Sequence, residues 1–415
     1  MANSITLHQY PVDTLTPVYN PLQYVASSTN SGQANFKFVI RITIGSNVVT
    51  LKQPPAPNGY LYLDIHRIVE NFVTSDILYN DSGFALNSNS FAIYTIRIGE
   101  EYGSTPVNYI DTVDHYSEQQ NVKAWNAIFD YKDWVNYNYL EWVIRKSAKR
   151  NFHTNAPQKV LNGIATKYFK IGYDQSAWLQ FATDDNHAVD NIYFASYSNA
   201  GTLIDEKIVA NPYASPSSTQ RIFRVTAGTK YLASLGLSLA GADYYIAVTL
   251  NGTPPGLSAE TSERIKYELD PLCTKYTVYR MHFKNKLGGF DGFNFYLKDT
   301  LTTQIDRDSF EKLPGTTSGN SFLWNVRDFG KRNTNIKLTD SIKVESDWIT
   351  NAEAVWLKEL FTTPEVYLED NTTHKLSPIV ITSAAYETKK INPAEKLFNA
   401  VIEFQPSIQN TRQRY

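Results

Sequence analysis

The segment Lys284–Thr300, KNKLGGFDGFNFYLKDT, has the composition of a ligand-binding loop. A phosphate-binding loop needs Lys and Ser or Thr after its last glycine, and both this loop and a dinucleotide fingerprint need a helix to follow. Here Gly292 is followed by FNFYLK, which alternates as a strand does, and a calcium loop needs more oxygen ligands than Asp291 supplies. We therefore predict a hairpin connection, in which Gly288, Gly289 and Gly292 supply positive φ and Asp291-Gly292 favours a tight turn.

Metal-ligand patterns are weak elsewhere in the chain. The stretch TDDNHAVDN offers several oxygen donors, but an acidic turn between strands is usually only solvated. The seven histidines show no HxxH or HxH spacing. Cys273 is the single cysteine, which excludes an intrachain disulfide and a cysteine-based zinc site within one chain, and we predict a buried, inert thiol. The oxygen donors of the acidic stretch are Asp184, Asp185, Asn186 and Asp190.

Catalytic motifs are equally weak. No GxSxG elbow occurs, and Cys273 has no basic neighbour in the sequence that would activate it. The pair Glu100-Glu101 could serve a glycosidase, but a position at the end of a strand explains it more simply. We therefore predict no catalytic residue, no cofactor and no metal, and a protein that is not an enzyme.

Composition favours a β protein made of several domains. A chain of 415 residues is expected to fold as two to four domains. The 39 basic and 41 acidic residues nearly balance, so charge indicates neither nucleic acid nor a membrane surface as partner. The 28 Tyr, 21 Phe and 7 Trp residues, among many Thr, Ser and Asn, suit strands and contact surfaces.

The periodicity of apolar residues divides the chain into three predicted domains. Residues 1–150 form a β domain with a short helix at 64–72, capped by Asp64, and a half-buried strand at 36–44. Residues 166–270 form a central β-sandwich of short strands, and residues 273–415 form an α+β domain. Within the last domain a helix is predicted over 350–361, where Thr350 and Glu353 form a capping box. The predicted strands of the sandwich are Lys167–Ile171, Ala177–Phe181, Asn191–Ser196, Arg221–Val225, Tyr244–Leu250 and Arg264–Asp270.

The order of these segments resembles a known family. The phrases that carry the resemblance are DIHRIVENF, IGEEY, CTKYTVYRMHFKNKLGGFDGFNFYL, WITNAEAVWLKELFTTPEVYL, SPIVITSAAYETKK and LFNAVIEFQPSIQNTRQR. They resemble structural proteins of tailed bacteriophages that infect Bacteroidetes, including relatives of the crAss-like group, which build rings in the tail, neck or baseplate. The likeness is clearest over 273–415 and includes no catalytic signature.

The resemblance implies a virion structural protein that acts by protein–protein assembly. Its expected partners are further copies in a six- or twelve-fold ring with head-to-tail contacts, other tail or neck proteins, and DNA that passes through a channel without specific binding. The N-terminus MANSITLHQYPV has no basic or strongly apolar leader, and no window is long and apolar enough to span a bilayer. We therefore expect synthesis in the host cytoplasm, assembly into the virion and no membrane partner.

Candidate subunit contacts are the proline-rich loop, the aromatic cluster at 125–142 and the basic C-terminus. An alternative function remains open, in which a Tyr- and Trp-rich sandwich binds a glycan or receptor, because aromatic side chains stack on sugar rings as well as on neighbouring subunits. The candidate contact residues are Pro54, Pro55, Trp125, Trp134, Trp142, Arg412, Arg414 and Tyr415.

Overall fold

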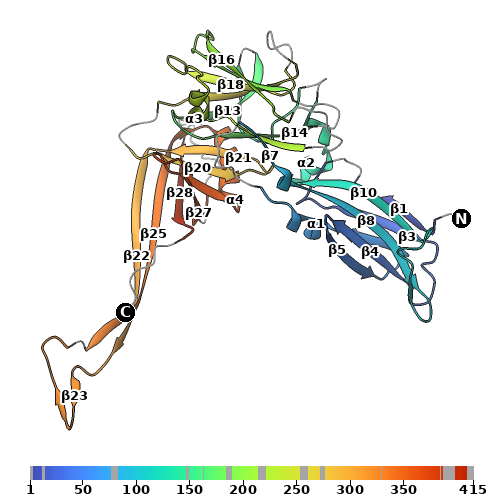
Figure 1. The fold of residues 1–415 in the computed structure, drawn as a ribbon, viewed down its shortest axis with the longest axis horizontal. Helices are drawn as coiled ribbons and strands as arrows, with labels where there is room; N and C mark the ends of the chain where they lie inside the picture. The colour runs from blue at the N-terminus through green and yellow to red at the C-terminus, as the bar shows by residue number, and fades with distance from the viewer. Residues whose placement is uncertain are drawn as a thin grey trace. The chain divides into compact units, whose positions relative to one another are not determined.

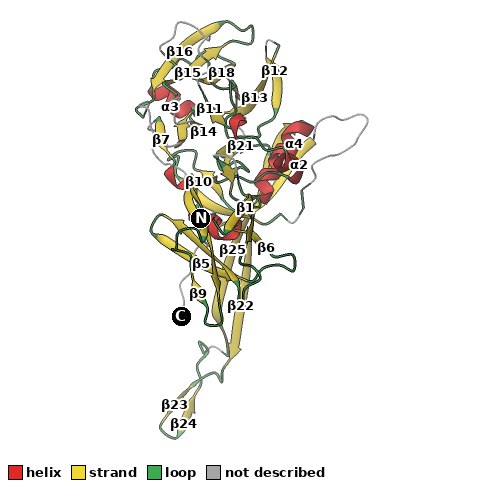
Figure 2. Cartoon of the chain, turned by 90° about the vertical axis from the view of Figure 1, so that its right-hand side faces the viewer, coloured by secondary structure: helices red, strands yellow, loops and turns green. Residues whose placement is uncertain are grey.

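A computed structural model describes residues 3–11, 15–75, 83–145, 149–161, 163–183, 189–213, 221–252, 260–271, 276–328, 330–383, 385–386 and 398–408. The protein is mainly β, with 52% strand and 10% helix, which confirms the predicted fold class (Figures 1 and 2). The chain divides into two compact units. Unit 1 contains Met1–Asp270 and Lys284–Asp291, and unit 2 contains Pro271–Phe283 and Gly292–Tyr415.

This division differs from the three domains predicted from the sequence. The regions 1–150 and 166–270 fall into one unit because a four-stranded sheet takes strands from both of them. Two of its strands come from the first region and two from the second. In sheet order the strands are β11 (Val143–Ile144), β14 (Trp178–Thr183), β17 (Arg221–Thr226) and β7 (Phe84–Leu86).

The N-terminal part of unit 1 consists of two sheets that share one core. On β4, Phe38, Ile40 and Ile42 are fully buried, as the period-two pattern predicted, but Val39 between them is fully buried too. The first sheet contains β1 (Ile5–Gln9), β3 (Gln23–Ser28) and β6 (Tyr60–Asp64). The second contains β2 (Thr16–Pro17), β10 (Tyr116–Trp125), β8 (Phe91–Tyr102), β4 (Lys37–Ile44) and β5 (Asn47–Gln53), with β9 (Val107–Asn108) beside β8.

The helix predicted at 64–72 is shorter than expected. It consists of α1 (His66–Val69) followed by a 3-10 turn, η1 (Glu70–Phe72). Asp64 assists its start, because its carboxylate accepts a hydrogen bond from the His66 amide at 3.1 Å, although Ile65 is the N-cap residue. The remaining helical segments of unit 1 are η2 (Ser88–Ser90), α2 (Tyr131–Val135), η3 (Tyr139–Glu141) and α3 (Thr229–Ser234).

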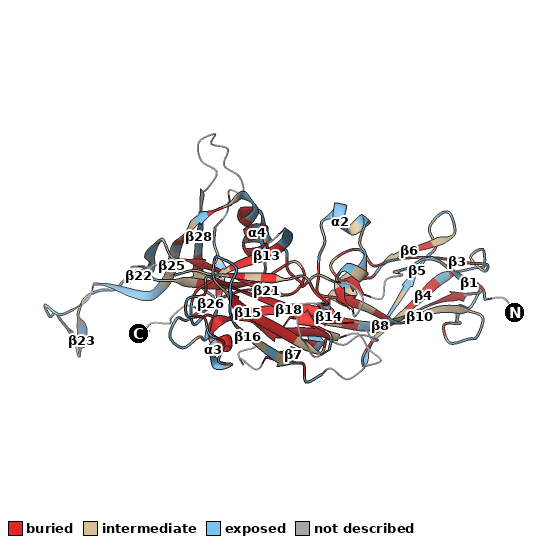
Figure 3. Cartoon of the chain, turned by 90° about the horizontal axis from the view of Figure 1, so that it is seen from above, coloured by how far each residue is buried: buried red, intermediate tan, exposed pale blue. Residues whose placement is uncertain are grey.

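The second half of unit 1 contains all six strands predicted in 166–270. They are divided between the four-stranded sheet and a six-stranded sheet, in which β15 and β18 are buried along most of their length (Figure 3). The edge strand β16 was not predicted, because its apolar and charged residues do not alternate. In sheet order the strands are β12 (Gln158–Leu161), β13 (Ile164–Ile171), β19 (Ile265–Leu269), β18 (Tyr244–Leu250), β15 (Asn191–Tyr197) and β16 (Leu203–Ala210).

The described residues of unit 2 form a seven-stranded sheet with one helix, α4 (Asn351–Thr362). The predicted capping box is confirmed: the Thr350 hydroxyl accepts from the Glu353 amide, and the Glu353 carboxylate accepts from the Thr350 amide at 2.7 Å. Trp356 of α4 packs on Phe283 and Phe293, with ring centroids 5.6 and 6.1 Å away. The sheet order is β21 (Phe290–Phe295), β20 (Tyr279–Lys284), β26 (Val366–Glu369), β27 (Leu376–Ile381), β28 (Phe398–Pro406), β25 (Lys331–Ile349) and β22 (Lys298–Glu311).

The glycine-rich segment contains a turn, as predicted, but the glycines and Asp291 do not have the predicted roles in it. The turn runs from Asn285 to Gly289, and of the three glycines Gly288 alone has positive φ, at +73°. The predicted Asp291-Gly292 turn is wrong, because both residues lie within β21. Gly292 is required for a different reason, because there is no room for a side chain: a Cβ there would lie 2.7 Å from the Arg280 guanidinium.

The tip of this hairpin packs inside unit 1. The Asn285 amide donates to the His153 carbonyl at 2.9 Å, and the Ser75 hydroxyl donates to the Gly288 carbonyl at 2.9 Å. The Asn285 side-chain oxygen accepts from the Leu287 and Gly289 amides. The backbone groups that a phosphate loop would offer to a ligand are therefore hydrogen-bonded within the protein.

Candidate functional site

The strands β22 and β25 of unit 2 continue beyond the rest of their sheet as a two-stranded hairpin (Figure 1). Strand β28 pairs with β25 at Ile342–Ile349, so beyond the Leu301–Ile342 pair β22 and β25 pair with each other alone among the described strands. We call residues 301–342 the arm. All fourteen residues of β22 are exposed, and Figure 3 shows the same for the outer part of β25.

The register of the arm separates apolar from polar side chains. The pairs Leu301–Ile342, Thr303–Asp340, Ile305–Leu338 and Arg307–Ile336 are directly opposite each other, so these eight side chains share one face. A hydrogen bond from the Thr303 hydroxyl to the Asp340 carboxylate, at 2.6 Å, agrees with this register. We call this the apolar face. The opposite face carries the pairs Thr302–Ser341, Gln304–Thr339, Asp306–Lys337 and Asp308–Asn335, none of which contains an apolar residue.

The apolar face extends the buried face of the sheet. Val344, next along β25 on the same face, is fully buried, as is its cross-strand neighbour Ile402. Farther out, the exposed fractions of Leu301, Ile305 and Ile336 are 69%, 42% and 45%. The core-facing row of side chains thus continues onto a ribbon that no described part of unit 2 covers. A two-stranded ribbon alone is marginally stable in water, so an uncovered apolar face of this kind indicates a surface that meets a partner.

The tip of the arm is also apolar. It contains a small hairpin of β23 (Thr316–Ser318) and β24 (Ser321–Leu323), where the rings of Phe322 and Trp324 pack edge to face with centroids 4.9 Å apart. Trp324 is 67% exposed and Val326 is fully exposed. The sequence carried a signal for the arm in β25, where Ile336, Leu338, Ile342 and Val344 recur two or four residues apart among mostly polar residues, but no strand was predicted there.

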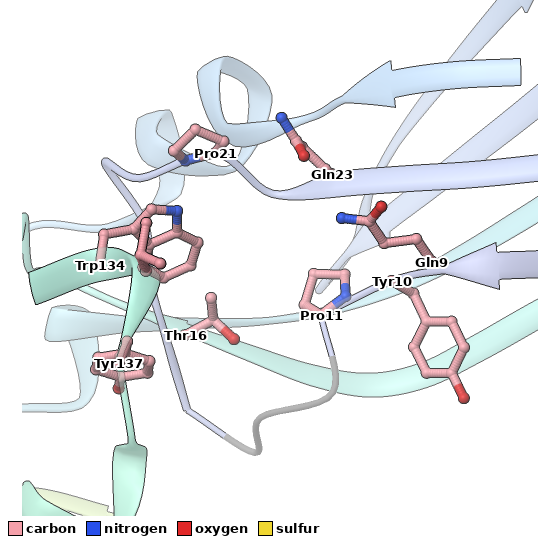
Figure 4. A pocket seen from close by; sticks show the side chains of 9 residues that line it. Gln9, Tyr10, Pro11, Thr16, Pro21, Gln23, Trp134 and Tyr137 are labelled. Carbon is pink, nitrogen blue, oxygen red and sulfur yellow. The ribbon is translucent and has the colours of Figure 1, made fainter. Parts of the chain in front are cut away.

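A cavity of about 260 Å³ lies in unit 1 beside α2 (Figure 4). Trp134 lines one side of it, and the side-chain amides of Gln9 and Gln23, from β1 and β3, lie across from its ring. The Trp134 and Tyr137 rings are 5.8 Å apart. An indole face with nearby amides is an arrangement that can stack on a sugar ring and hydrogen-bond its hydroxyls. The lining residues are Gln9, Tyr10, Pro11, Thr16, Pro21, Gln23, Trp134, Val135 and Tyr137.

The carboxylate pair Glu100-Glu101 lies near the end of β8, as the simpler interpretation held, and both side chains have hydrogen-bond or ion-pair partners. Burial alone raises the pKa of Glu100, but hydrogen bonds outweigh it and bring the pKa below its usual value. The carboxylate accepts from Ser28 at 2.5 Å and from Asn30 at 2.9 Å. Glu101 forms an ion pair with Lys52. Further donors to Glu100 are His115, at 2.6 Å, and Ser4, at 2.8 Å.

The prediction that Trp125 forms a subunit contact is wrong, because its side chain is fully buried in a core cluster of unit 1. Its ring lies 4.4 Å from that of His153, a histidine whose pKa burial lowers to about 3. Trp142 is half-buried against the same cluster. Composition gave no means of separating these core aromatics from Trp134, which is half-buried at the cavity.

The remaining predicted contact residues are placed as follows. Pro54 is exposed and Pro55 half-buried in the loop after β5. Arg412, Arg414 and Tyr415 lie outside the described residues, as do Cys273 and the predicted oxygen donors Asp184, Asp185 and Asn186. Asp190 is described, and its carboxylate accepts from the Gly252 amide at 2.6 Å. Among the described residues, His, Cys, Asp and Glu form no group of three suited to a metal ion.

No protein-family model matches this chain, and a search of curated proteins finds no matching relative. None of the described helices is long and apolar enough to cross a bilayer.

Proposed function

We propose that this chain is a structural subunit of a virion ring, in the tail, neck or baseplate of a tailed phage that infects Bacteroidetes. The resemblance of the segments supplies the phage setting. The observation that best supports an assembly role is the apolar face of the arm, because a ribbon of this length with one apolar face needs a partner to cover it. The proposed partners are further copies of the chain and other tail or neck proteins.

Removal of the arm tests this proposal. Leu301 and Ile342 are directly opposite, so an Asn-Gly turn can join them in place of residues 302–341 without disturbing the strand pairs at the base. We expect the full chain to form oligomers in light scattering and the shortened chain to remain a monomer. The proposal fails if the full chain is monomeric at about 100 μM, a concentration that fills an interface of micromolar Kd, or if the shortened chain assembles equally well.

A second function, glycan binding, is favoured by the cavity at Trp134. Sugar recognition combines stacking on an aromatic ring with hydrogen bonds to amides, and Trp134 with Gln9 and Gln23 offers both. A glycan array followed by calorimetry tests it. Trp134→Ala should abolish binding, whereas Tyr131→Ala should not, because Tyr131 is 81% exposed on the same helix and does not line the cavity. An array without hits, or equal binding by both variants, refutes this function.

A further inference from the structure

We propose that the proline-rich loop of one copy binds the cavity at Trp134 of the next copy, head to tail. The inference deepens the proposed assembly function and rests on it, because it names two surfaces of unit 1 that join neighbouring subunits. The proline-rich loop is residues 54–57, PPAP, between β5 and β6, and the side chains of Pro54 and Pro57 are exposed.

The sequence of the loop restricts its conformation. Proline fixes its own φ at about −65° and keeps the preceding residue extended, so the segment is held close to a polyproline II helix. Such a helix has about three residues per turn, which places Pro54 and Pro57 on one face. Their exposure agrees with this, because Pro55 and Ala56 between them are half-buried. A turn in which the Gly59 amide donates to the Ala56 carbonyl at 2.8 Å fixes the end of the loop, so binding costs little further ordering.

The cavity has the groups that bind such a loop. Segments with two prolines at this spacing dock in aromatic-lined grooves, and the rings of Trp134 and Tyr137 line this cavity. Prolines lack an amide hydrogen, so the loop offers mainly carbonyl acceptors, to which the side-chain amides of Gln9 and Gln23 can donate. The nine described residues that line the cavity include no charged side chain, and the loop has none either. A charged partner would lose its hydration in this cavity without meeting an opposite charge.

The loop and the cavity lie at opposite ends of the N-terminal sheets, so the contact must join two copies. Strand β3 runs from Gln23, which lines the cavity, to Ser27, which pairs with Tyr60, the first residue of β6 after the loop. The four steps from Gln23 to Ser27 span about 13 Å at 3.3 Å per residue. Strands β5 and β6 hold both ends of the loop. The loop therefore cannot reach the cavity of its own chain.

A contact between two different surfaces of the same chain is head to tail. Each copy carries one loop and one cavity, so a closed ring fills every cavity, whereas an open pair leaves one loop and one cavity unused. A loop of this length buries far less than the roughly 1,200 Å² of a stable isolated complex, so the contact is weak in a pair and effective in a closed ring. This geometry is that of the head-to-tail ring expected from the sequence.

Cross-linking of two full-length variants tests the contact. In a Cys273→Ser background, one variant carries Asn58→Cys, beside the loop, and the other Val135→Cys, at the cavity. Mixed at about 100 μM, where an interface of micromolar Kd is filled, they should form a mixed dimer through a short bis-maleimide. Each variant alone should form little dimer, because a head-to-tail contact does not bring the same residue of two copies together.

The matched control is Val48→Cys, which is exposed near the other end of β5 and should not cross-link to Val135→Cys. The proposal is wrong if the Asn58→Cys and Val135→Cys mixture gives no more dimer than either variant alone, or if Val48→Cys cross-links equally well. Neither outcome decides the assembly function, which is tested separately by the arm deletion.

Replacement of the prolines tests what the cavity recognises. Pro54→Ala together with Pro57→Ala, in the Asn58→Cys variant, should reduce the mixed dimer about tenfold, because alanine lacks the ring that packs on Trp134. Pro106→Ala, at an exposed proline of another loop, should change nothing. An undiminished dimer after the double replacement would overturn the proposal. Neither Pro54 nor Pro57 lines the cavity, so the double variant keeps the groups proposed for glycan binding and separates the two uses of this site.

Discussion

The substitution Gly288→Ala tests whether the glycine-rich turn is fixed by close packing within unit 1. Gly288 has φ of +73°, and a Cβ added there would lie 2.2 Å from the Asn126 carbonyl oxygen, well inside any allowed contact. Gly236, at the end of α3, is the matched control. Its φ is +75°, but a Cβ there would meet nothing within 4 Å. The two substitutions share the backbone strain and differ in the clash.

The expected magnitudes follow from these two contributions. A non-glycine residue in the left-handed region costs about 1 kcal/mol, which is the whole effect expected for Gly236→Ala. At position 288 the turn must also shift away from Asn126, and this disturbs the Ser75–Gly288 hydrogen bond, worth about 1 kcal/mol, and the packing around it. We expect Gly288→Ala to lower the free energy of unfolding by about 3 kcal/mol.

Equilibrium unfolding in urea, followed by tryptophan fluorescence, measures both variants. The difference between them should be about 2 kcal/mol, which isolates the cost of the close approach from that of the backbone conformation. Equal destabilisation by the two substitutions would refute the reasoning. It would mean that the turn can move away from Asn126 at little cost and that Gly288 is required for its dihedral angle alone.

Three further predictions concern single side chains. Burial raises the pKa of Glu369, but its hydrogen bonds with His282 and His374 and the charge of Arg280 outweigh burial and lower the pKa to about 2. The ionised carboxylate therefore contributes about 3 kcal/mol to the stability of unit 2 above pH 4.5, and this contribution is lost as the pH falls from 4.5 towards 2. Glu369→Gln should flatten the stability of unit 2 in acid titrations over this window. Thr350→Ala removes a capping box and should lower the free energy of unfolding, measured in urea, by about 1 kcal/mol. Thr372→Ala, in an exposed turn, should change the free energy of unfolding little. Trp125→Ala should lower the free energy of unfolding by about 3–5 kcal/mol, measured by thermal or chemical unfolding. Trp134 is half-buried, so Trp134→Ala should lower it by less than half as much. Similar losses for the two variants would contradict the different burial of the two side chains.

Local patterns in the sequence predicted most of the secondary structure. The alternation of Phe38, Ile40 and Ile42 identified a strand, and the residues Thr350 and Glu353 identified the start of α4. These predictions succeeded because the cause of each structure lies within a few residues of the chain. The division into units depends instead on β7 pairing with β17, far along the sequence, for which three residues of strand give no signal.

The candidate site was harder to predict from the sequence, because it too depends on contacts between residues that are far apart in the chain. Gly292 is required because the Arg280 guanidinium lies against it, and Trp125 is buried because His153 and Trp142 pack on it. Such requirements come from residues that are distant in sequence. A count of aromatics or glycines therefore cannot tell a contact surface from a core, or a turn glycine from one that makes room for a side chain.

The polar face of the arm supports the assembly role as strongly as the apolar face does. A long exposed hairpin with two open edges risks pairing with other strands at random. Lys337, Asp306 and Asp308 place charges along one face of the ribbon, and such charges oppose indiscriminate association. The two faces differ in their apolar residues: the polar face has none in its four pairs, whereas the opposite face exposes Leu301, Ile305 and Ile336 beside Arg307 and Asp340.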